Sequence, residues 1–422
     1  MTPCGRCGVV PSPSASRCPR AGEGDCVLAP PLPDAWWIDP DEEQPFLRYR
    51  RSLWSWTAAL AAGLDDGTYR SIVTELDDAV AAVDGRGFRV TPCGEEPALA
   101  AAAGHDGALW VKDETGNVSG SHKARHLFGI AIHLAVLERA GRGSGTDAPL
   151  AIASCGNAAL GAAVVAAAAR RTLRVYVPPV AAPSVIERLG ELGAELVICE
   201  RRDGEAGDPC YLRFREAVSS GAVAFGCQGP DNGLTIDGGR TLGFELGEQV
   251  GGAGLDRLYV QVGGGALATS VTDGLSLAAG VDGPLGREPA LHPVQTEGCH
   301  PLSLAHDRVA DRFGGDLEEA SRHRAEVMVP WPTEPSSAAG GILDDETYDW
   351  QAVLRRTRST GGRPVVVSEA DVEAANRLVA EHTDVAADHT GTAGLAGLVH
   401  DVSAGTDADG GSVAVLLTGR RR

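Results

Sequence analysis

The sequence predicts an α/β fold built from mostly parallel, doubly wound sheets. Apolar strand-like segments alternate with helix-like segments along most of the chain, and this alternation is typical of parallel sheets covered by helices. The length of 422 residues suits two such layers better than one minimal domain. Hydrophobic residues make up 43% of the chain and charged residues 22%, as in a globular protein with a sizeable core.

The expected elements follow from apolar periodicity and turn signals. We expect strands over residues 109–112, 149–153, 173–177, 194–199, 222–225, 257–262, 293–296 and 413–417. We expect helices over residues 121–140, 158–170, 184–192, 211–218, 235–250, 269–277, 368–381 and 391–399. Ser184 is the expected N-cap of its helix.

Residues 1–44 form a Cys-rich and Pro-rich extension ahead of apolar-periodic sequence that starts at Pro45. Cys4 and Cys7 have the spacing of a zinc knuckle, but Cys18 and Cys26 are separated by seven residues. The segment is therefore either a degenerate, structural zinc knuckle or a flexible leader. We expect the other six cysteines to be reduced thiols of the core.

Charge and hydropathy exclude several classes of partner. The formal net charge of −20 argues against sequence-independent nucleic-acid binding, which needs clustered Lys and Arg. No apolar run is long enough to span a bilayer, and the first residues lack the pattern of a signal peptide. We expect a cytoplasmic protein that acts on a small molecule, with no nucleic-acid or membrane partner.

The most informative stretch is KDETGNVSGSHKAR, from Lys112 to Arg125. It puts Lys123 in the first turn of a predicted helix, directly after a polar loop. The positive potential at a helix N-terminus, together with desolvation, lowers the pKa of an amine and favours imine formation. By position alone, an exposed surface lysine is the simpler interpretation.

Two further turns have the form of anion-binding loops, in which backbone N–H groups at a helix start face the ligand. The first comprises Ser154, Cys155, Gly156, Asn157 and Ala158. The second comprises Gly263, Gly264, Gly265, Ala266 and Leu267. An ordinary helix cap and a tight structural turn are the respective alternatives. Cys155 is expected to be a contact residue, because no catalytic His partner for a nucleophile is identifiable.

The order of these motifs resembles the fold type II enzymes that use pyridoxal phosphate (PLP), from about Pro45 to Thr418. Lys123 matches their Schiff-base lysine, and GSHKAR at residues 120–125 is similar to their usual GSFKDR. His122 resembles the corresponding histidine of the tryptophan synthase β chain. The segment FLRYR at residues 46–50 resembles the N-terminal segment of threonine synthases. Within the family, the chain is therefore most similar to the branch of threonine synthases and threonine dehydratases.

The resemblance implies a role for each motif. The loop at residues 154–158 would hold the substrate carboxylate, and Asn157 would bond the 3′ oxygen of PLP. The turn at residues 263–267 would hold the phosphate, with Ala266 in place of a fourth glycine. Thr418 would face the pyridine nitrogen, where a neutral hydroxyl favours elimination over transamination.

The resemblance also implies an architecture. Residues 45–121 and 227–422 would form a larger PLP-binding domain, and residues 122–226 a smaller mobile α/β domain. PLP would lie in the cleft between these two doubly wound domains, and the enzyme would be a homodimer.

The expected function is a PLP-dependent lyase of amino-acid metabolism, similar to threonine synthase. It would act on a small amino acid by elimination, or elimination and replacement, at the β or γ carbon. The alternatives are a serine or threonine ammonia-lyase, a catalytically silent PLP-fold binding protein, and a zinc-dependent interaction protein. His122, Arg125 and Arg240 are either groups that position anions or packing residues.

Overall fold

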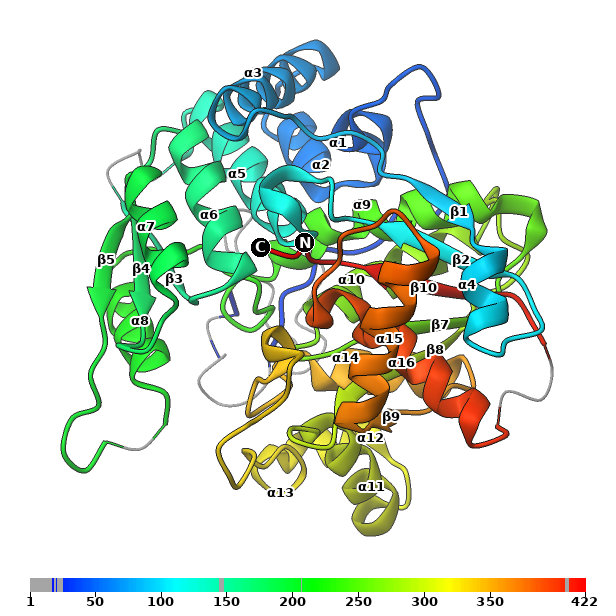
Figure 1. The fold of residues 1–422 in the computed structure, drawn as a ribbon. Helices are drawn as coiled ribbons and strands as arrows, with labels where there is room; N and C mark the ends of the chain where they lie inside the picture. Colours follow the sequence, from blue (N-terminus) through cyan, green and yellow to red (C-terminus); the bar gives the residue numbers. More distant parts are fainter. Residues whose placement is uncertain (1–16, 19, 21–25, 144–147, 206, 407–409) are drawn as a thin grey trace.

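The computed structural model describes residues 17–18, 20, 26–143, 148–205, 207–406 and 410–422. In these residues the chain forms two sheets covered by helices (Figure 1). The smaller sheet lies on the left of Figure 1 with α6, α7 and α8, and the larger sheet lies on the right. The predicted α/β class with mostly parallel sheets is confirmed.

The larger sheet has six strands, and only β1 is antiparallel to its neighbour. Their spatial order is β1 (Cys93–Glu95), β2 (Leu109–Asp113), β10 (Val413–Leu417), β7 (Arg257–Gln261), β8 (Ala290–Thr296) and β9 (Val365–Val367). Alternate residues of a strand face opposite sides of the sheet. Accordingly Leu258 and Val260 of β7 join the core cluster that contains α10, whereas Tyr259 joins the cluster that contains α16.

The smaller sheet has four parallel strands. Their order is β5 (Glu195–Ile198), β4 (Leu173–Val177), β3 (Leu150–Ala153) and β6 (Val223–Ala224). Leu150 and Ile152 of β3 pack with α5 and α6, and Ala151 packs on the opposite face with Phe214 of α8. Helices therefore cover both faces, as the alternating sequence pattern predicts.

The helices agree with most of the predicted ranges. They are α1 (Pro45–Arg48), α2 (Trp54–Ala61), α3 (Asp66–Asp84), α4 (Pro97–Ala102), α5 (Lys123–Arg139), α6 (Asn157–Ala168), α7 (Pro183–Glu191), α8 (Pro209–Ser219), α9 (Leu234–Val250), α10 (Ala266–Ala278), α11 (Pro301–Phe313), α12 (Leu317–Arg322), α13 (Arg324–Val327), α14 (Trp350–Ser359), α15 (Glu369–His382) and α16 (His389–Ser403). Short 3₁₀ helices are η2 (Arg50–Ser52), η3 (Val118–Gly120), η4 (Gly251–Ala253) and η5 (Gly340–Ile342).

One expectation about these elements is wrong, and two regions escaped prediction. Ser184 is not the N-cap of α7, because that helix starts at Pro183 with Ala182 as its N-cap. Proline suits the first helical position, where its missing N–H costs nothing. No helix or strand is predicted over residues 45–108, where α1 to α4 and β1 lie, or over residues 297–367, where α11 to α14 and β9 extend the larger half of the molecule.

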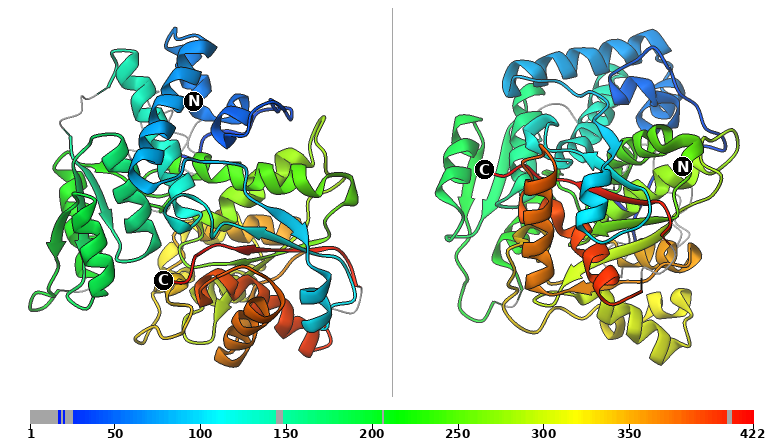
Figure 2. Two further views of the ribbon diagram at one scale, coloured as in Figure 1. Left: turned by 45° about the horizontal axis from the view of Figure 1, so that its top comes forward. Right: turned by 45° about the vertical axis from the view of Figure 1, so that its right-hand side comes forward.

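The extension also contacts the folded body. Trp36 packs against Tyr49 and Phe244 with ring centroids 6.0 and 5.9 Å apart, and the carbonyl of Pro30 accepts a hydrogen bond from Arg240. Residues 30–36 therefore lie against α9 and the start of the helical body (Figure 2).

Parallel strand order decides where the motifs meet. Leu417 at the end of β10 pairs with Asp113 at the end of β2, and Val415 pairs with Tyr259 of β7. The carboxyl ends of these three strands therefore share one edge of the sheet. Ligands of open α/β sheets bind outside that edge.

Candidate active site

Lys123 is the first residue of α5, and β10 fixes the position of this helix start. The N–H of His122 donates to the carbonyl of Thr418 at 3.2 Å, and Ser121 forms a β-bridge with Gly419. Lys123 itself is half-buried. The structure thus brings Lys123 beside Thr418, 295 residues later in the chain, as the C-terminal strand order requires.

The chain has only two lysines, Lys112 and Lys123. Lys112 is fully buried, and its ammonium donates to Glu245, Gln249 and the carbonyl of Thr91 at 2.6 to 2.7 Å. All three donor positions of Lys112 are therefore occupied, which leaves Lys123 as the lysine able to react with a ligand. The lysine count was an available sequence signal for this assignment.

A buried ion network holds the first turn of α5 in place. Arg125 bonds Glu114 at 2.8 Å and Glu245 at 2.6 Å, and all three side chains are fully buried. Burial raises the pKa of the Glu245 carboxyl, but the charges of Arg125 and Lys112 outweigh it and lower that pKa overall. Arg125 is therefore a packing residue that fixes the helix two residues after Lys123.

The glycine turn connects β7 to α10 at the same sheet edge. Gly265 is the N-cap of α10 with φ of 98°, a left-handed conformation that favours glycine, and it provides no side-chain cap. The first N–H groups of a helix lack intrahelical partners. The buried hydroxyl of Thr269, in the first turn of α10, also lacks a partner among the described residues. These donors suit an anion, and Thr269 is a residue that sequence reasoning missed.

Asp344 lies against the glycine turn and was not identified from the sequence. A Cβ atom added to Gly263 would lie 2.4 Å from an Asp344 carboxylate oxygen. Burial raises the pKa of Asp344 to about 6, while the charge of Lys123 and the N–H of Gly264 act in the opposite direction. Asp344 therefore lies against the glycine turn, within electrostatic range of Lys123.

The loop at residues 154–158 leads from β3 into α6. Cys155 and Gly156 are exposed, Ser154 and Ala158 are half-buried, and the Ser154 hydroxyl accepts the N–H of Gly156 at 3.3 Å. Asn157 starts α6 and reaches the larger sheet, since a Cβ atom on Gly419 would lie 3.0 Å from its amide nitrogen. The loop therefore faces the end of β10 from the other sheet.

Thr418 is buried at the end of β10. Its hydroxyl oxygen accepts a hydrogen bond of 2.6 Å from the Gln261 amide. The same amide nitrogen lies 3.1 Å from the carbonyls of Gly391 and Leu416, which fixes its orientation. Because the hydroxyl accepts from Gln261, its own proton is available to a different acceptor.

Other predicted groups have structural roles. Arg240 is buried and bonds Asp237 and Asp273 as well as Pro30, so it is a packing residue. Burial and the nearby Lys123 charge lower the pKa of His122 well below its usual value. In the segment at residues 46–50, Arg48 and Tyr49 both bond Glu248 of α9.

The cysteines are only partly as expected. Cys199, Cys210, Cys227 and Cys299 are buried, but Cys93 is half-buried and Cys155 is exposed, because Cys155 lies in a surface turn. Although Cys155 is exposed, the surrounding protein partly desolvates its thiol and raises the pKa of that thiol. This argues against a thiolate nucleophile.

The N-terminal cysteines give no metal site in the described part of the chain. Cys4 and Cys7 lie outside the described residues, and Cys18 and Cys26 are buried together with Leu28. Among the residues that the structure describes, no group of three or more His, Cys, Asp or Glu side chains could hold a metal ion. Within the same residues, no helix is long and apolar enough to cross a membrane.

Comparisons with known proteins agree with this geometry. Residues 86–419 match the model of a family described as pyridoxal-phosphate dependent enzymes. Phenylserine dehydratase of Ralstonia pickettii is 27% identical over 313 residues, 74% of this chain and 82% of the relative. L-threonine ammonia-lyase of Thermotoga maritima is 27% identical over 317 residues, 74% of this chain and 67% of the relative.

A solved structure of maize serine racemase has the same fold. Its TM-score is 0.62 at 17% identity, covering 83% of this chain and 93% of that one. The chain belongs to the family of pyridoxal-phosphate-dependent enzymes, since the family model matches most of its length. The predicted family and fold are confirmed, and so is the prediction of a PLP-dependent lyase, because one relative is named a dehydratase and the other an ammonia-lyase.

The glycine turn provides a test of whether these residues fit PLP. A Cβ atom on Gly264 would lie 3.0 Å from the Tyr348 ring, so a larger residue there would crowd the turn. The uncapped start of α10 and the unpartnered Thr269 hydroxyl offer donors to a phosphate. The residues present therefore fit the cofactor.

Proposed function

We propose that the protein is a PLP-dependent lyase that removes water from a small β-hydroxy amino acid and releases a 2-oxo acid and ammonia. The observation that carries this proposal is the position of Lys123, the one reactive lysine, beside Thr418 at the edge of the larger sheet and facing α6 of the smaller sheet. The substrate class comes from the two lyase relatives, whose names specify phenylserine and threonine.

Residues of both sheets would hold the cofactor. Lys123 would bind its aldehyde carbon covalently, and the turn at residues 263–267 with Thr269 would bind its phosphate. The Asn157 amide would bond its phenolic oxygen, and the Thr418 hydroxyl would donate to its ring nitrogen. When bound, PLP supplies an electron-withdrawing ring that accepts the electron pair left at Cα.

The protein's own groups would then direct the elimination. The loop at residues 154–158 would hold the substrate carboxylate through N–H groups at the positive end of α6. The free Lys123 amine would take the Cα proton and deliver a proton to the leaving β-hydroxyl, which departs as water. The released enamine then hydrolyses to the 2-oxo acid and ammonia.

This proposal favours simple elimination over the replacement reaction of threonine synthase. The segment at residues 46–50 carried the likeness to that branch, but Arg48 and Tyr49 contact Glu248 of α9. Arg50 likewise bonds Asp39 and Asp66. These contacts anchor the N-terminal helices, so the segment gives no support to a replacement reaction.

The test combines trapping of the cofactor with product analysis. Borohydride reduction and peptide mapping should label Lys123 and not Lys112. L-serine, L-threonine and phenylserine should yield ammonia and a 2-oxo acid, whereas Lys123→Ala should reduce turnover by at least 10³-fold, as expected for loss of the acid–base group and the covalent link.

Label on Lys112 would refute the assignment of Lys123. Release of inorganic phosphate from O-phospho amino acids, without ammonia release from the hydroxy amino acids, would instead support the threonine-synthase-like reaction. PLP bound without turnover of any substrate would support a silent binding protein.

We also propose that the two sheets mark two domains, residues 45–121 with 227–422 and residues 122–226. The homodimer and the cytoplasmic location stay predictions. Light scattering after size-exclusion chromatography tests the first, and cell fractionation tests the second.

A further inference from the structure

A cationic pocket lies next to the candidate active site. Its volume is about 520 Å³, within the range of small-molecule sites. It is lined by Asp84, Arg86, Ser119, Gly120, Leu160, Val164, Arg188, Leu192, Arg420, Arg421 and Arg422. Five arginines and one aspartate give this pocket a strong positive charge in a chain of net charge −20.

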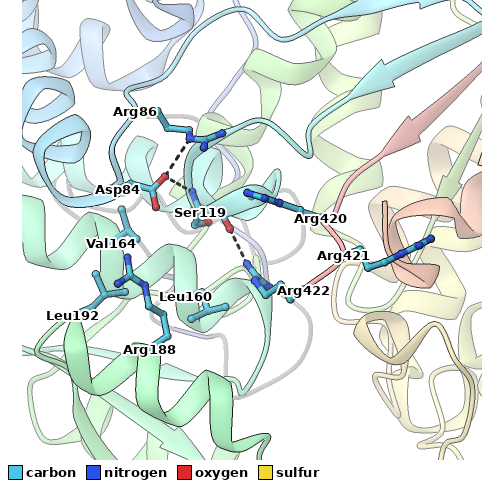
Figure 3. Close-up of a pocket in the computed structure, with 11 residues that line it drawn as sticks. Asp84, Arg86, Ser119, Leu160, Val164, Arg188, Leu192, Arg420, Arg421 and Arg422 are labelled. Carbon is cyan, nitrogen blue, oxygen red and sulfur yellow. Dashed lines mark hydrogen bonds and ion pairs between the residues drawn. The ribbon is translucent and has the colours of Figure 1, made fainter. Parts of the chain in front are cut away.

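The arginines approach the pocket from different elements. Arg420 extends toward Ser119 and Arg86, and Arg422 also points at Ser119 (Figure 3). The guanidinium of Arg420 has no bonded partner among the described residues, and Arg420 is exposed. Arg421 points away and bonds Asn376. Of the three C-terminal arginines, Arg420 and Arg422 are therefore the two that point into the pocket.

The 3₁₀ helix η3 lines the pocket and contains a further hydrogen-bond donor, the Ser119 hydroxyl. Ser119 has φ of 56°, which is uncommon for a residue other than glycine, and such strain is concentrated at functional sites. Its carbonyl accepts a bond of 2.7 Å from Arg422, and its N–H donates to Asp84 at 3.0 Å. Its buried hydroxyl lacks a partner within the described part of the chain.

The pocket contacts the active site through Arg422. The guanidinium of Arg422 donates both to the Ser119 carbonyl and to the side-chain oxygen of Asn157. Leu160 and Val164 of the pocket follow Asn157 along α6 by three and seven residues, so all three share one helix face. Burial lowers the pKa of Arg422, Asp388 opposes this shift, and the charge of Arg420 adds to it.

We propose that this pocket binds the phosphate group of a small molecule between Arg420 and Arg422. Phosphate is the anion that suits the site, because planar guanidinium groups bond its oxygens in pairs and the Ser119 hydroxyl supplies another donor. An anion there competes with Asn157 for Arg422. Phosphate binding is therefore linked to the residue that faces the cofactor.

The binding test uses the PLP-loaded enzyme, in which the cofactor already fills the glycine turn. Sodium phosphate is titrated calorimetrically at constant ionic strength. We expect one saturable site, with affinity lowered about tenfold or more by either Arg420→Ala or Arg422→Ala, the effect of losing a charge-assisted hydrogen bond.

Matched variants separate this effect from general charge. Arg355→Ala removes an exposed arginine on α14 that pairs with Glu318, and it should leave phosphate affinity unchanged. Arg420→Lys keeps the charge but loses the paired guanidinium bonds, so it should restore only part of the affinity that Arg420→Ala loses. Thermal unfolding checks that each variant is folded. Absence of saturable binding, or equal affinity in wild type and both alanine variants, would overturn the proposal.

Two sources of phosphate remain to be distinguished, and only this step rests on the proposed function. If the phosphate belongs to the substrate, Arg420→Ala should raise KM for O-phospho-L-serine but not for L-threonine. If it belongs to a separate metabolite, phosphate should change turnover of L-threonine without competing with it. The calorimetric result stands or fails independently of either reaction.

Discussion

The Asp344 carboxylate lies against the glycine turn, where we propose that the phosphate of PLP binds. Burial raises its pKa to about 6, the nearby Lys123 and the N–H of Gly264 lower it, and Asp345 and Asp208 raise it further. Above about pH 6 the carboxylate is mostly ionised and would repel the cofactor phosphate, whereas below about pH 6 it is mostly neutral. The tightness of cofactor binding should therefore depend on this carboxyl.

We predict that Asp344→Asn binds PLP more tightly than wild type above pH 7, by on the order of tenfold, or ~1.4 kcal/mol. The difference should vanish near pH 5, where wild-type Asp344 is protonated. Equilibrium titration by absorbance measures both affinities. Pyridoxal, which lacks the phosphate, is the control. The ratio of its affinities for Asp344→Asn and for wild type should not change with pH. An affinity ratio for PLP that is also flat would contradict the prediction.

Thr418 tests the choice of reaction at the residue scale. Its hydroxyl accepts from Gln261 and leaves its proton for the ring nitrogen. Thr418→Asp should hold that nitrogen protonated, strengthen the electron sink and shift products toward pyridoxamine phosphate. Thr418→Val removes only a neutral bond worth about 1 kcal/mol and should impair turnover less than Lys123→Ala.

The products of these variants can be quantified by chromatography from the same reactions. Unchanged ratios of 2-oxo acid, ammonia and pyridoxamine phosphate in Thr418→Asp would mean that Thr418 does not face the ring. The C-terminal part of the proposed cofactor site would then have to be abandoned.

At the scale of elements, the buried ion network joins β2, α5 and α9 through Lys112, Arg125 and Glu245. Removing one partner from a fully buried ion pair leaves an uncompensated charge. The pKa of Glu245 is lowered in the folded protein, so its stabilising contribution is present above its unfolded pKa and is lost as the pH falls through its folded pKa.

We therefore predict that Glu245→Gln lowers the free energy of unfolding by about 3–5 kcal/mol at pH 7. Glu195→Gln is the matched control, because its partner Arg174 is exposed and such pairs contribute roughly 0–1 kcal/mol. Urea unfolding followed by circular dichroism measures both. Equal losses in the two variants would show that the network does not anchor α5.

At the scale of the whole molecule, the proposed cofactor contacts come from both sheets. Asn157 follows β3 of the smaller sheet, while the glycine turn and Thr418 end strands of the larger one. PLP would therefore bind only when both halves are folded and correctly placed. A ligand that binds the folded state alone raises the melting temperature with its concentration.

We predict a PLP-dependent rise in Tm that Gly264→Val largely abolishes, because a side chain there meets Tyr348 and crowds the turn. Gly286→Val is the control, since a Cβ atom at Gly286 meets no atom within 4 Å. Differential scanning fluorimetry across PLP concentrations gives the result. A full thermal shift in Gly264→Val would place the phosphate elsewhere.

Most elements could be predicted because their signals are local. Short apolar runs bounded by turn signals indicated β4, β7 and β10, and a polar loop followed by helical periodicity placed Lys123 at the start of α5. The regions of α1 to α4 and of α11 to α14 escaped prediction because several of their helices are short or strongly polar. In the second region, α14 packs onto β8 and α10, and α11 and α12 pack onto α14, so these helices depend on partners outside their own sequence.

The sequence by itself determined the fold class, the family and the motifs around Lys123, Asn157, the glycine turn and Thr418. It also contained the lysine count, which narrows the reactive lysine to Lys112 or Lys123. Only the tertiary structure decided which groups meet: Asp344 at the glycine turn, Gln261 on Thr418, and Arg422 on Asn157. These contacts join residues 81 to 265 positions apart, and strand order and packing decide such distances, which local sequence does not encode.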